Sequence, residues 1–533
     1  MGIPERIVRF VFNLTAERIV YFDNYPGQPK KKIFVGLPQG SILSPTLFAI
    51  YINNIDKVIS SRYCKILKFA DDLVIYSIKE SIKNALTDLE TQVNNISEEL
   101  NNRNLTLAPE KCKLVIFNRQ NLKRDTYKIN IEGIDIMPSS DVKFLGVTLD
   151  SKLNWNKHIE QVKIKCDLPI RILSSIRAVW WGADPTTMLN LCKSLVRSRI
   201  EYGGFIISPC KEKLFYELEK VQLKCLRLAM GYRNSTPSNI IIGESKVPLL
   251  KNRFKFLGYK YIAKSISLMR QPLLRSLEEI IESSGQLILE NNYDKSILAQ
   301  CYEEVQVYTN IIRKMDKIAY FQFDFSNQLK KPIIDLGSGL ELKISPNPNR
   351  EFKMRYENTR DGWIHIYTDG SRIEENGRCR VAMACWSENN QLKISRRLLD
   401  FTSIFTVEAI AILEAIRNLN KYNISKAKIF SDSRSVMLAL RNTYNGKHQP
   451  YIIHQIRDDL INCERRGIQI NLIWIPAHRG LDGNEYADEE AKKSTQNDTI
   501  NEIVIPYTDI IRIYKEKCNR INERELIETA ISK

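Results

Sequence analysis

Four acidic residues in the last third of the chain stand where a folded protein usually places apolar side chains or helix caps. They are Asp369 after the apolar run Ile366–Thr368, Glu408 inside an apolar helical stretch, Asp432 after Ile429–Ser431, and Asp488 near a helix start. Burying several carboxylates together is costly unless a cation neutralises them. Clustered carboxylate oxygens suit Mg²⁺ or Mn²⁺. Two such ions, roughly 3.5–4 Å apart, can activate a water and stabilise the leaving oxygen of a phosphodiester.

Each of these acidic residues also has a plainer interpretation. Asp432 can simply cap the helix that follows it, and Asp369-Gly370 alone is typical of a turn. Glu408 is harder to explain, because its neighbours Val407 and Ile410 are apolar. Glu414 lies on the same helical stretch, but the pattern of the candidate metal-binding carboxylates does not favour it as a ligand. The individual residues therefore leave structural and catalytic roles open.

The segments around the four acidic residues alternate between strand and helix. The extended ones are Trp363–Thr368, Arg378–Ser387, Ala427–Ser431 and Gln469–Ile475, and the helical ones are Ser403–Leu419 and Ser433–Arg441. Strands followed by helices predict an α/β sheet domain. The turn-rich segment 344–350 ahead of this domain is expected to be a linker.

The order and spacing of these motifs resemble type 1 ribonuclease H over residues 360–495. The resemblance rests on Tyr367-Thr-Asp-Gly-Ser, Thr406-Val-Glu-Ala, Ser431-Asp-Ser and Trp474-Ile-Pro-Ala-His-Arg-Gly-Leu-Asp-Gly-Asn-Glu-Tyr-Ala-Asp488. It implies a five-stranded mixed sheet with flanking helices, and hydrolysis of the RNA strand of RNA–DNA hybrids, read through 2′-hydroxyl contacts.

The same resemblance assigns roles to individual residues. It implies that two Mg²⁺ (or Mn²⁺) ions are held by Asp369, Glu408, Asp432 and Asp488. His478 would assist proton transfer or product release; in isolation it would be read as an exposed loop histidine. Asn484 and Ser433 would support the site from beside the ligands.

The front of the chain carries a second set of motifs. Gly36-Leu-Pro-Gln-Gly-Ser41, which includes Gln39 and Gly40, is followed by Lys68-Phe-Ala-Asp-Asp-Leu-Val74. An Asp-Asp pair in a turn is a weak signal by itself. Together with the earlier loop, Asp71 and Asp72 resemble the palm of a reverse transcriptase. The segments 105–117, which contain Lys111, and 142–150 are similar to the next two palm segments.

The remaining residues complete the expected domain organisation. Residues 156–345 are almost continuously helical in pattern, and Trp180–Pro185 and Arg197–Gly203 resemble the thumb of jockey-like or I-like non-LTR retrotransposon polymerases. We therefore expect a multidomain chain: a partial α+β palm (1–155), a helical thumb (156–240), a helical connection and linker (241–355), the α/β ribonuclease H domain (360–495) and a tail (496–533).

One polymerase feature is missing from its expected place. Polymerases of this kind use a third carboxylate on an earlier strand, and the only aspartate ahead of Gly36 is Asp23. Asp23 aligns with a variable stretch, so it is not expected to be that ligand. The sequence is expected to begin inside the palm, near Gly2-Ile-Pro4, as an N-terminally truncated form. Loss of the ligand would remove transition-state stabilisation, so no template copying is expected from this chain alone.

Composition bears on partners and location. The formal net charge is +17, and most of the excess precedes residue 360, which favours a polyanionic partner. The expected partners are an RNA–DNA hybrid and a primer–template.

The 11 cysteines contain no CxxC pair. We therefore expect neither disulfides nor structural zinc, and we expect the protein to be intracellular, in the cytoplasm, the nucleus or both. No apolar run is long enough for a membrane span. The sequence leaves the oligomeric state undetermined.

Three functional interpretations compete. The first is a truncated retroelement polyprotein with an intact ribonuclease H site. The second is a catalytically inactive nucleic-acid-binding relic. The third, an integrase-like or resolvase-like nuclease, is disfavoured by the segment from His478 to Asp488, since those families close the site differently. The sequence favours the first, because all four carboxylates and His478 are present together.

Overall fold

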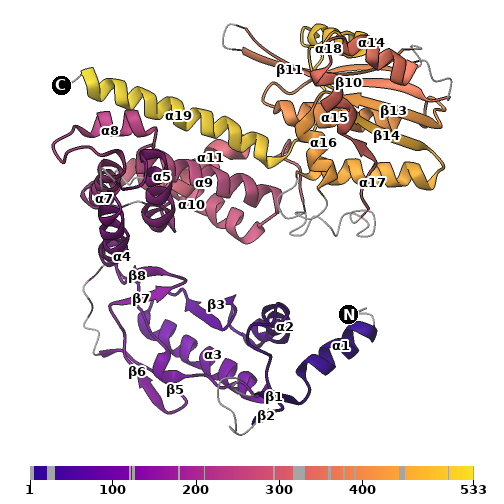
Figure 1. Cartoon of the computed structure of the whole chain (residues 1–533). Helices are drawn as coiled ribbons and strands as arrows, with labels where there is room; N and C mark the ends of the chain where they lie inside the picture. The colour runs from indigo at the N-terminus through magenta and orange to yellow at the C-terminus, as the bar shows by residue number, and fades with distance from the viewer. Residues whose placement is uncertain are drawn as a thin grey trace. The chain divides into compact units, whose positions relative to one another are not determined.

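The computed structural model describes the chain in two units, residues 1–160 and 161–533 (Figure 1). The described residues are 5–20, 31–118, 120, 122, 126–177, 181–208, 210–291, 295–315, 330–357, 362–375, 378–388, 392–442, 450–501 and 503–531. The expected palm start at Gly2-Ile-Pro4, as well as Asp23 and Trp180, lie outside them. No helix in the described part of the chain is both long and apolar enough to cross a membrane.

The N-terminal unit is built from short hairpins around one long helix. Its helices are α1 (Glu5–Thr15), α2 (Ser44–Tyr51), α3 (Ile82–Asn102) and the 3₁₀ turns η1 (Ile55–Val58) and η2 (Pro109–Lys111). Its strands pair as β1 (Arg18–Val20) with β2 (Lys31–Ile33), β3 (Cys64–Phe69) with β4 (Asp72–Ser77), β5 (Ile129–Ile131) with β6 (Ile134–Ile136), and β7 (Asp141–Phe144) with β8 (Val147–Asp150), all antiparallel.

Helix α3 organises the core of this unit. Its apolar face contributes Val93, Ile96 and Leu100, which pack against the β3–β4 hairpin on one side and the β5–β6 hairpin on the other. The apolar run 113–117, whose composition is typical of a strand, does not form one: within the described residues, it makes a single β-bridge, between Leu114 and Pro138. An apolar, β-branched run remains a loop where no neighbouring strand supplies a hydrogen-bonding ladder.

The first part of the C-terminal unit is helical, as expected. Helix α4 (Asn156–Ser175) begins in the last residues of the first unit and continues into this one. It is followed by α5 (Pro185–Leu191), the π-helical turn η4 (Cys192–Arg197), α6 (Ser198–Glu201), α7 (Glu212–Met230), α8 (Ser238–Ser245), α9 (Leu250–Ser267), α10 (Gln271–Asn291), α11 (Ile297–Val305) and the 3₁₀ turn η5 (Gln306–Tyr308). Asp184 caps α5 by accepting hydrogen bonds from the backbone N–H groups of Thr186 and Thr187. Asp184-Pro185 is thus a helix start, with proline in the first turn.

One expectation about the cysteines is wrong. Cys192 in η4 and Cys225 in α7 form a disulfide, with 6.1 Å between their Cα atoms. The two residues are 33 positions apart, so no short motif marked them in the sequence. Packing of η4 against α7 brings the two buried side chains together, within the separation that a disulfide requires.

The second part of the C-terminal unit contains a mixed six-stranded sheet in the order β12-β11-β10-β13-β14-β9. Its strands are β9 (Ile334–Asp335), β10 (Ile364–Glu375), β11 (Arg378–Ser387), β12 (Lys393–Leu398), β13 (Lys426–Ser431) and β14 (Gln469–Trp474). Strands β10, β11 and β12 are antiparallel neighbours, whereas β13, β14 and β9 run parallel to β10. The expected five-stranded mixed sheet is present, extended by the two-residue strand β9.

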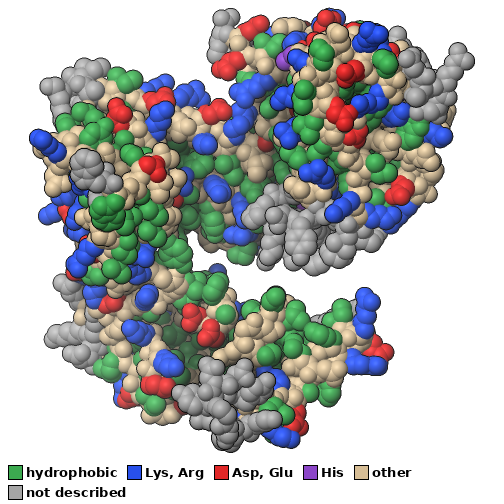
Figure 2. Space-filling model, viewed as in Figure 1, with side chains coloured by type: hydrophobic (Ala, Val, Ile, Leu, Met, Phe, Trp, Pro, Cys, Tyr) green, Lys and Arg blue, Asp and Glu red, His purple; other side chains and the backbone are tan. Residues whose placement is uncertain are grey.

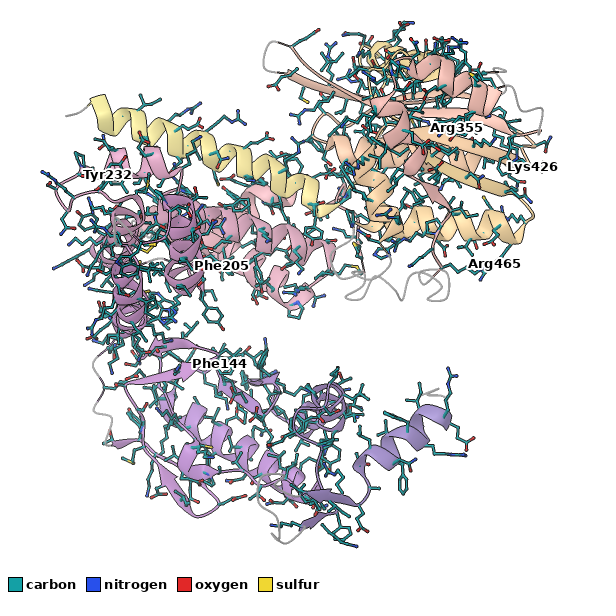
Figure 3. All side chains as sticks on the ribbon, in the orientation of Figure 1. Phe144, Phe205, Tyr232, Arg355, Lys426 and Arg465 are labelled. Carbon is teal, nitrogen blue, oxygen red and sulfur yellow. A yellow bond between two sulfur atoms is a disulfide. The ribbon has the colours of Figure 1, made fainter. Side chains whose placement is uncertain are left out.

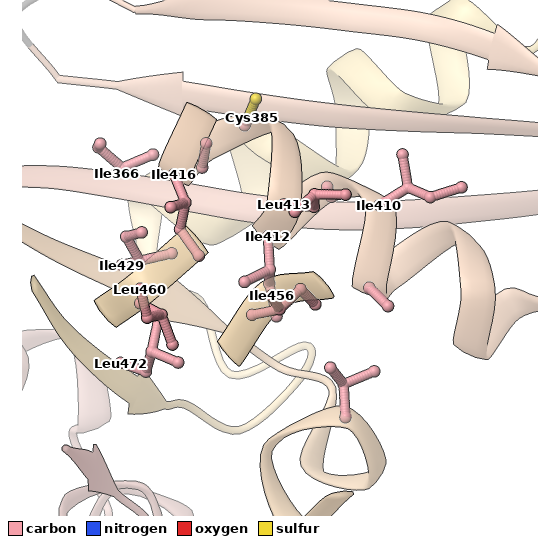
Figure 4. Close-up of a cluster of buried hydrophobic side chains, with 14 of the residues drawn as sticks. Ile366, Cys385, Ile410, Ile412, Leu413, Ile416, Ile429, Ile456, Leu460 and Leu472 are labelled. Atoms are coloured by element: carbon pink, nitrogen blue, oxygen red, sulfur yellow. The ribbon is translucent and has the colours of Figure 1, made fainter. Parts of the chain in front are cut away.

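Helices cover both faces of this sheet. On one face lie α15 (Ile404–Asn418), α16 (Arg434–Arg441) and α17 (Tyr451–Arg465), and Figure 4 shows Ile412, Ile416 and Ile456 from this layer packed over Ile366 and Ile429 of the sheet. On the other face lie α13 (Gly337–Ile344), α14 (Pro348–Phe352), the π-helical turn η7 (Lys353–Glu357) and α18 (Asp482–Ser494). The period-3.6 apolar pattern of α15 explains its position in the middle of the core.

The segment 344–350, expected to be a linker, is part of this packed body. It forms the turn between α13 and α14, whose Leu342 and Phe352 are buried against Tyr367 and Phe430 of the sheet. The prolines do interrupt the helix, but apolar residues on both sides of them anchor the segment. The sheet therefore draws its first strand from Ile334, well before the expected boundary.

The tail also has a defined structure. Residues 507–531 form a long helix, α19 (Tyr507–Ile531), which packs along α9 (Figure 1). The rings of Tyr514 and Tyr259 stack at a centroid distance of 4.0 Å, and the Tyr514 hydroxyl donates to the Glu304 backbone carbonyl. Apolar side chains at helical spacing account for this packing.

Candidate metal centre

Asp369 and Asp432 are brought together by the sheet. In the parallel ladder Thr368 of β10 lies opposite Ser431 of β13, so the next residue on each strand is an aspartate. Asp369 was expected to end its strand, and this is wrong: β10 continues to Glu375 because it stays paired with β11. Asp369 instead lies inside β10, one residue past the last pair that β10 forms with β13. Lys426 and Arg465 lie at the opposite end of the sheet (Figure 3).

Glu408 reaches the same place from helix α15. A Cβ atom on Gly370 would lie 2.9 Å from Cγ1 of Val407 and 3.1 Å from the backbone nitrogen of Glu408. Only a residue without a side chain allows α15 to come this close to β10. The Asp-Gly pair is therefore required by packing at this position, and the turn interpretation of Asp369-Gly370 is wrong.

Asp488 is supplied by helix α18 on the other face. A Cβ on Gly483 would lie 2.3 Å from ring atoms of Tyr367, so α18 sits directly on β10. Asp488 is hydrogen-bonded to Asp369 and forms an ion pair of 2.5 Å with Lys492. The four predicted carboxylates thus converge from the sheet and from a helix on each of its faces.

The candidate metal ligands form two separate groups of three residues within the described part of the chain. Ligand atoms of Asp369, Glu408 and Asp432 all lie within 4.8 Å of one another, and so do those of His478, Glu485 and Asp488. The Asp369–Asp488 hydrogen bond joins the groups. Three carboxylates within this range match the oxygen-ligand clusters that bind divalent cations.

The electrostatics of the first group are unfavourable without a cation. Burial, together with the charges of Asp432 and Asp488, raises the pKa of Asp369 to about 8. Burial, Asp432 and Asp369 raise the pKa of Glu408 well above its usual range. Burial also raises the pKa of Asp432. Each carboxylate disfavours ionisation of the others, and a bound dication reverses that balance.

The two predicted supporting residues contact the carboxylates. Ser433 is hydrogen-bonded to Glu408, and Asn484 is hydrogen-bonded to Asp432, which lowers the pKa of each acceptor. One oxygen of Glu408 (Oε2) and Oδ1 of Asn484 are buried and find no hydrogen-bond partner within the described part of the chain. A buried oxygen without a donor is costly, and a cation at this position would satisfy it.

His478 lies on the loop between β14 and α18. Its side chain is exposed, its backbone φ is +50°, and its charge lowers the pKa of Asp432. It is therefore next to the carboxylates and open to solvent.

Three residues of the site were not singled out from the sequence. Trp474 donates a hydrogen bond from Nε1 to the backbone carbonyl of Asp432, at 3.0 Å, and thereby fixes the turn that carries this ligand. Glu485 joins the second group, and Lys492 pairs with Asp488. Glu485 and Lys492 follow the i, i+3 and i, i+4 spacing from Asp488 on α18, a signal that the sequence did contain.

The polymerase-like residues have a different setting. Asp71 and Asp72 lie at the tip of the β3–β4 hairpin, as expected, where Ala70 adopts a φ of +51°. Both side chains are exposed, as are Gln39 and Gly40 in the loop before α2 and Lys111 at the end of η2. Among the described residues, neither aspartate belongs to a group of three potential metal ligands.

Comparisons with known proteins agree with this division. Residues 1–149 match the reverse transcriptase (RNA-dependent DNA polymerase) family, and residues 361–496 match the RNase H family. The chain is 24% identical over 268 residues to the RNA-directed DNA polymerase from mobile element jockey of Drosophila melanogaster, covering 49% of this chain and 29% of that protein. It is 28% identical over 144 residues to ribonuclease H1 of Mus musculus, covering 25% of this chain and 50% of that protein.

The solved structure of LC11-RNase H1 in complex with RNA/DNA hybrid aligns with a TM-score of 0.20 and 16% identity, covering 25% of this chain and 96% of that one. The chain spans less than a third of the length of the jockey polymerase. Two family matches in this order, with retrotransposon polymerases among the relatives, identify the architecture. The chain joins a reverse transcriptase region of the non-LTR retrotransposon type to a C-terminal ribonuclease H domain.

Proposed function

We propose that this chain hydrolyses the RNA strand of RNA–DNA hybrids at the site formed by Asp369, Glu408, Asp432 and Asp488. The observation that carries the proposal is the convergence of these four carboxylates in a site where ionisation of Asp369 and Glu408 is disfavoured. An uncompensated cluster of this kind destabilises a fold, so its presence is most simply explained by bound cations. The similarity of this domain to ribonuclease H1 supports an RNA–DNA hybrid as the substrate.

The donor set fits two divalent ions of the Mg²⁺ or Mn²⁺ type. Asp369, Glu408 and Asp432 would hold one, and Asp369 and Asp488 would share in holding the other. When bound, such ions activate a water and stabilise the charge that develops on a phosphodiester. The unpartnered oxygens of Glu408 and Asn484 point to the same use of the site.

The other residues prepare the site for this chemistry. Ser433 orients Glu408, and Asn484 orients Asp432, because each makes a hydrogen bond to the ligand. Trp474 holds the backbone of Asp432 from behind. His478 can accept or return a proton at a ring nitrogen, since it is exposed and adjacent to Asp432. Hydrolysis would leave a 3′-hydroxyl and a 5′-phosphate.

The basic character of the chain suits the substrate. The net charge is +17, and Figure 2 shows Lys and Arg side chains across the visible face of the C-terminal unit. Such charge binds a phosphate backbone through counterion release. We propose that the polymerase region binds nucleic acid as well. Synthesis by that region would require a third carboxylate, which we do not identify among the described residues around Asp71 and Asp72.

The test compares two glutamates on one helix. The full chain is incubated with a labelled RNA–DNA hybrid and Mg²⁺, alongside Glu408→Gln, Asp432→Asn and Glu414→Gln. Glu414 lies on α15 but pairs with Arg396, so its variant controls for loss of a partly buried charge. We expect loss of at least a hundredfold in cleavage rate for the first two variants, and little change for the third. Binding without cleavage by the wild type would instead support the inactive relic.

A further inference from the structure

The N-terminus of helix α15 is held by a residue from the tail. Asp509, in the first turn of α19, accepts a hydrogen bond at Oδ2 from the backbone N–H of Ser403, with an N···O distance of 3.1 Å. The same carboxylate is hydrogen-bonded to the side chains of Ser403 and Thr406, and it is only 3% exposed. Ser403 in turn caps α15, its Oγ accepting from the backbone N–H of Thr406.

This arrangement fixes the helix that carries Glu408. The first N–H groups of a helix lack partners within it, and a negative charge beside them is favourable. Ser403 accepts from the N–H of Thr406, and Asp509 accepts from the N–H of Ser403, so both bonds are made about one turn before Glu408. From that turn, α15 runs past Gly370 at the closest approach that β10 allows. A small displacement of the first turn therefore moves Glu408 relative to Asp369.

The tail is well anchored for this task. The Arg512 guanidinium donates to the backbone carbonyl of Phe401, which holds the residues just before Ser403. Ahead of the helix, Ile505 forms a parallel bridge with Ile312, with backbone hydrogen bonds on both sides. The contact between the Asn522 side-chain oxygen and the backbone N–H of Leu249 lies at the other end of α19 and takes no part in holding the first turn beside Ser403.

From these contacts we propose that Asp509 is a positioning residue for the metal centre. The functional ribonuclease unit then extends through α19, beyond the segment 361–496 that matches the family. This inference rests on the proposed function, because it concerns metal binding at the same carboxylates. It assigns to the tail a role in preorganising Glu408, in the way that residues behind a metal ligand set its orientation.

The experiment measures metal binding directly, in the full-length chain. Mn²⁺ binding is titrated by calorimetry for the wild type, Asp509→Asn, Asp509→Ala and Asn522→Ala. Asn522→Ala is the matched control, because it removes a contact that α19 makes with Leu249 instead of with the residues around Ser403. We expect the Mn²⁺ dissociation constant to rise about tenfold for Asp509→Ala and less for Asp509→Asn, which keeps an acceptor oxygen. Asn522→Ala should bind Mn²⁺ as the wild type does.

The outcomes separate positioning from general stability. The melting temperature without metal is recorded for every variant, and the titrations are run well below it. Asp509 variants that bind Mn²⁺ as tightly as the wild type, or that weaken binding no more than Asn522→Ala, would overturn the inference. If Asp509→Ala does not fold, Asp509→Asn and Ser403→Ala decide by the same criterion.

Cleavage assays on the same samples distinguish this inference from the proposed function. If the wild type cleaves the hybrid and the Asp509 variants bind Mn²⁺ as tightly as the wild type does, only the positioning role of Asp509 is contradicted. Mn²⁺ binding that depends on Asp509, without cleavage by the wild type, would contradict only the proposed hydrolysis. A wild type that binds no Mn²⁺ would contradict both.

Discussion

Replacing Asp369 by asparagine should stabilise the metal-free protein while abolishing its metal site. Asp369 is buried and its pKa is raised from 3.8 to about 8 by burial and by Asp432 and Asp488. Because the pKa in the folded chain lies above that in the unfolded chain, the protonated carboxyl favours folding. That contribution is complete below pH 3.8 and is lost as the pH rises towards 8. Asparagine has nearly the same shape and never ionises.

The magnitude follows from the same values. A tenfold change in proton affinity corresponds to about 1.4 kcal/mol. Because Asp369 ionises readily in the unfolded chain but not in the folded one, the free energy of unfolding at pH 7 falls by on the order of 4 kcal/mol from its low-pH value, and at pH 5 by about 2 kcal/mol. In EDTA, Asp369→Asn should therefore exceed the wild type in free energy of unfolding, by more at pH 8 than at pH 5. With saturating Mg²⁺ the difference should shrink or reverse, since the wild type gains binding energy.

Urea unfolding followed by tryptophan fluorescence measures this difference. Asp482→Asn is the control: Lys353 lowers the pKa of that exposed carboxyl, so the variant should be slightly less stable than the wild type and never more stable. An Asp369→Asn variant no more stable than the wild type in EDTA at pH 8 would contradict the raised pKa of Asp369. A gain in stability that is the same at pH 5 and pH 8 would contradict it as well.

Two further substitutions test how the site is supported. Gly483→Ala should lower the free energy of unfolding by about 1–3 kcal/mol, because the new methyl group overlaps the ring of Tyr367. Gly243→Ala in α8 is the control: a Cβ there meets no atom within 4 Å, so the melting temperature should change little or rise. Trp474→Phe removes the hydrogen bond to the Asp432 carbonyl, so the Mg²⁺ concentration for half-maximal cleavage should rise severalfold. An unchanged Mg²⁺ requirement in this variant would exclude a role for Trp474 in placing Asp432.

Local sequence patterns predicted part of the ribonuclease H domain and left β12 and α17 unassigned. The segments Arg378–Ser387 and Gln469–Ile475, expected to be extended, correspond to β11 and β14, and the helical segment Ser403–Leu419 corresponds to α15. These local patterns did not predict correctly where strand formation depends on a neighbouring strand. The run 113–117 has strand character but lacks a paired strand within the described residues, and β9 has only two residues.

The sequence by itself determined which side chains can form the metal site. The settings of Asp369, Glu408, Asp432 and Asp488 singled them out, and the resemblance of the surrounding motifs to type 1 ribonuclease H implied that they are metal ligands. Only the tertiary structure decided how they meet. The ladder between β10 and β13 sets two of them side by side, and the bare backbone of Gly370 admits the helix that carries the third.

Contacts between distant segments were also invisible in the sequence. The carboxylate of Asp509 lies 106 residues from the backbone nitrogen it accepts from, and Cys192 lies 33 residues from Cys225. No local period or spacing encodes such pairs, because they depend on how whole helices pack. The residue types and their order therefore indicated the chemistry of this site. The position of Glu408, in contrast, depends on contacts with α19, which lies outside the ribonuclease H-like motifs.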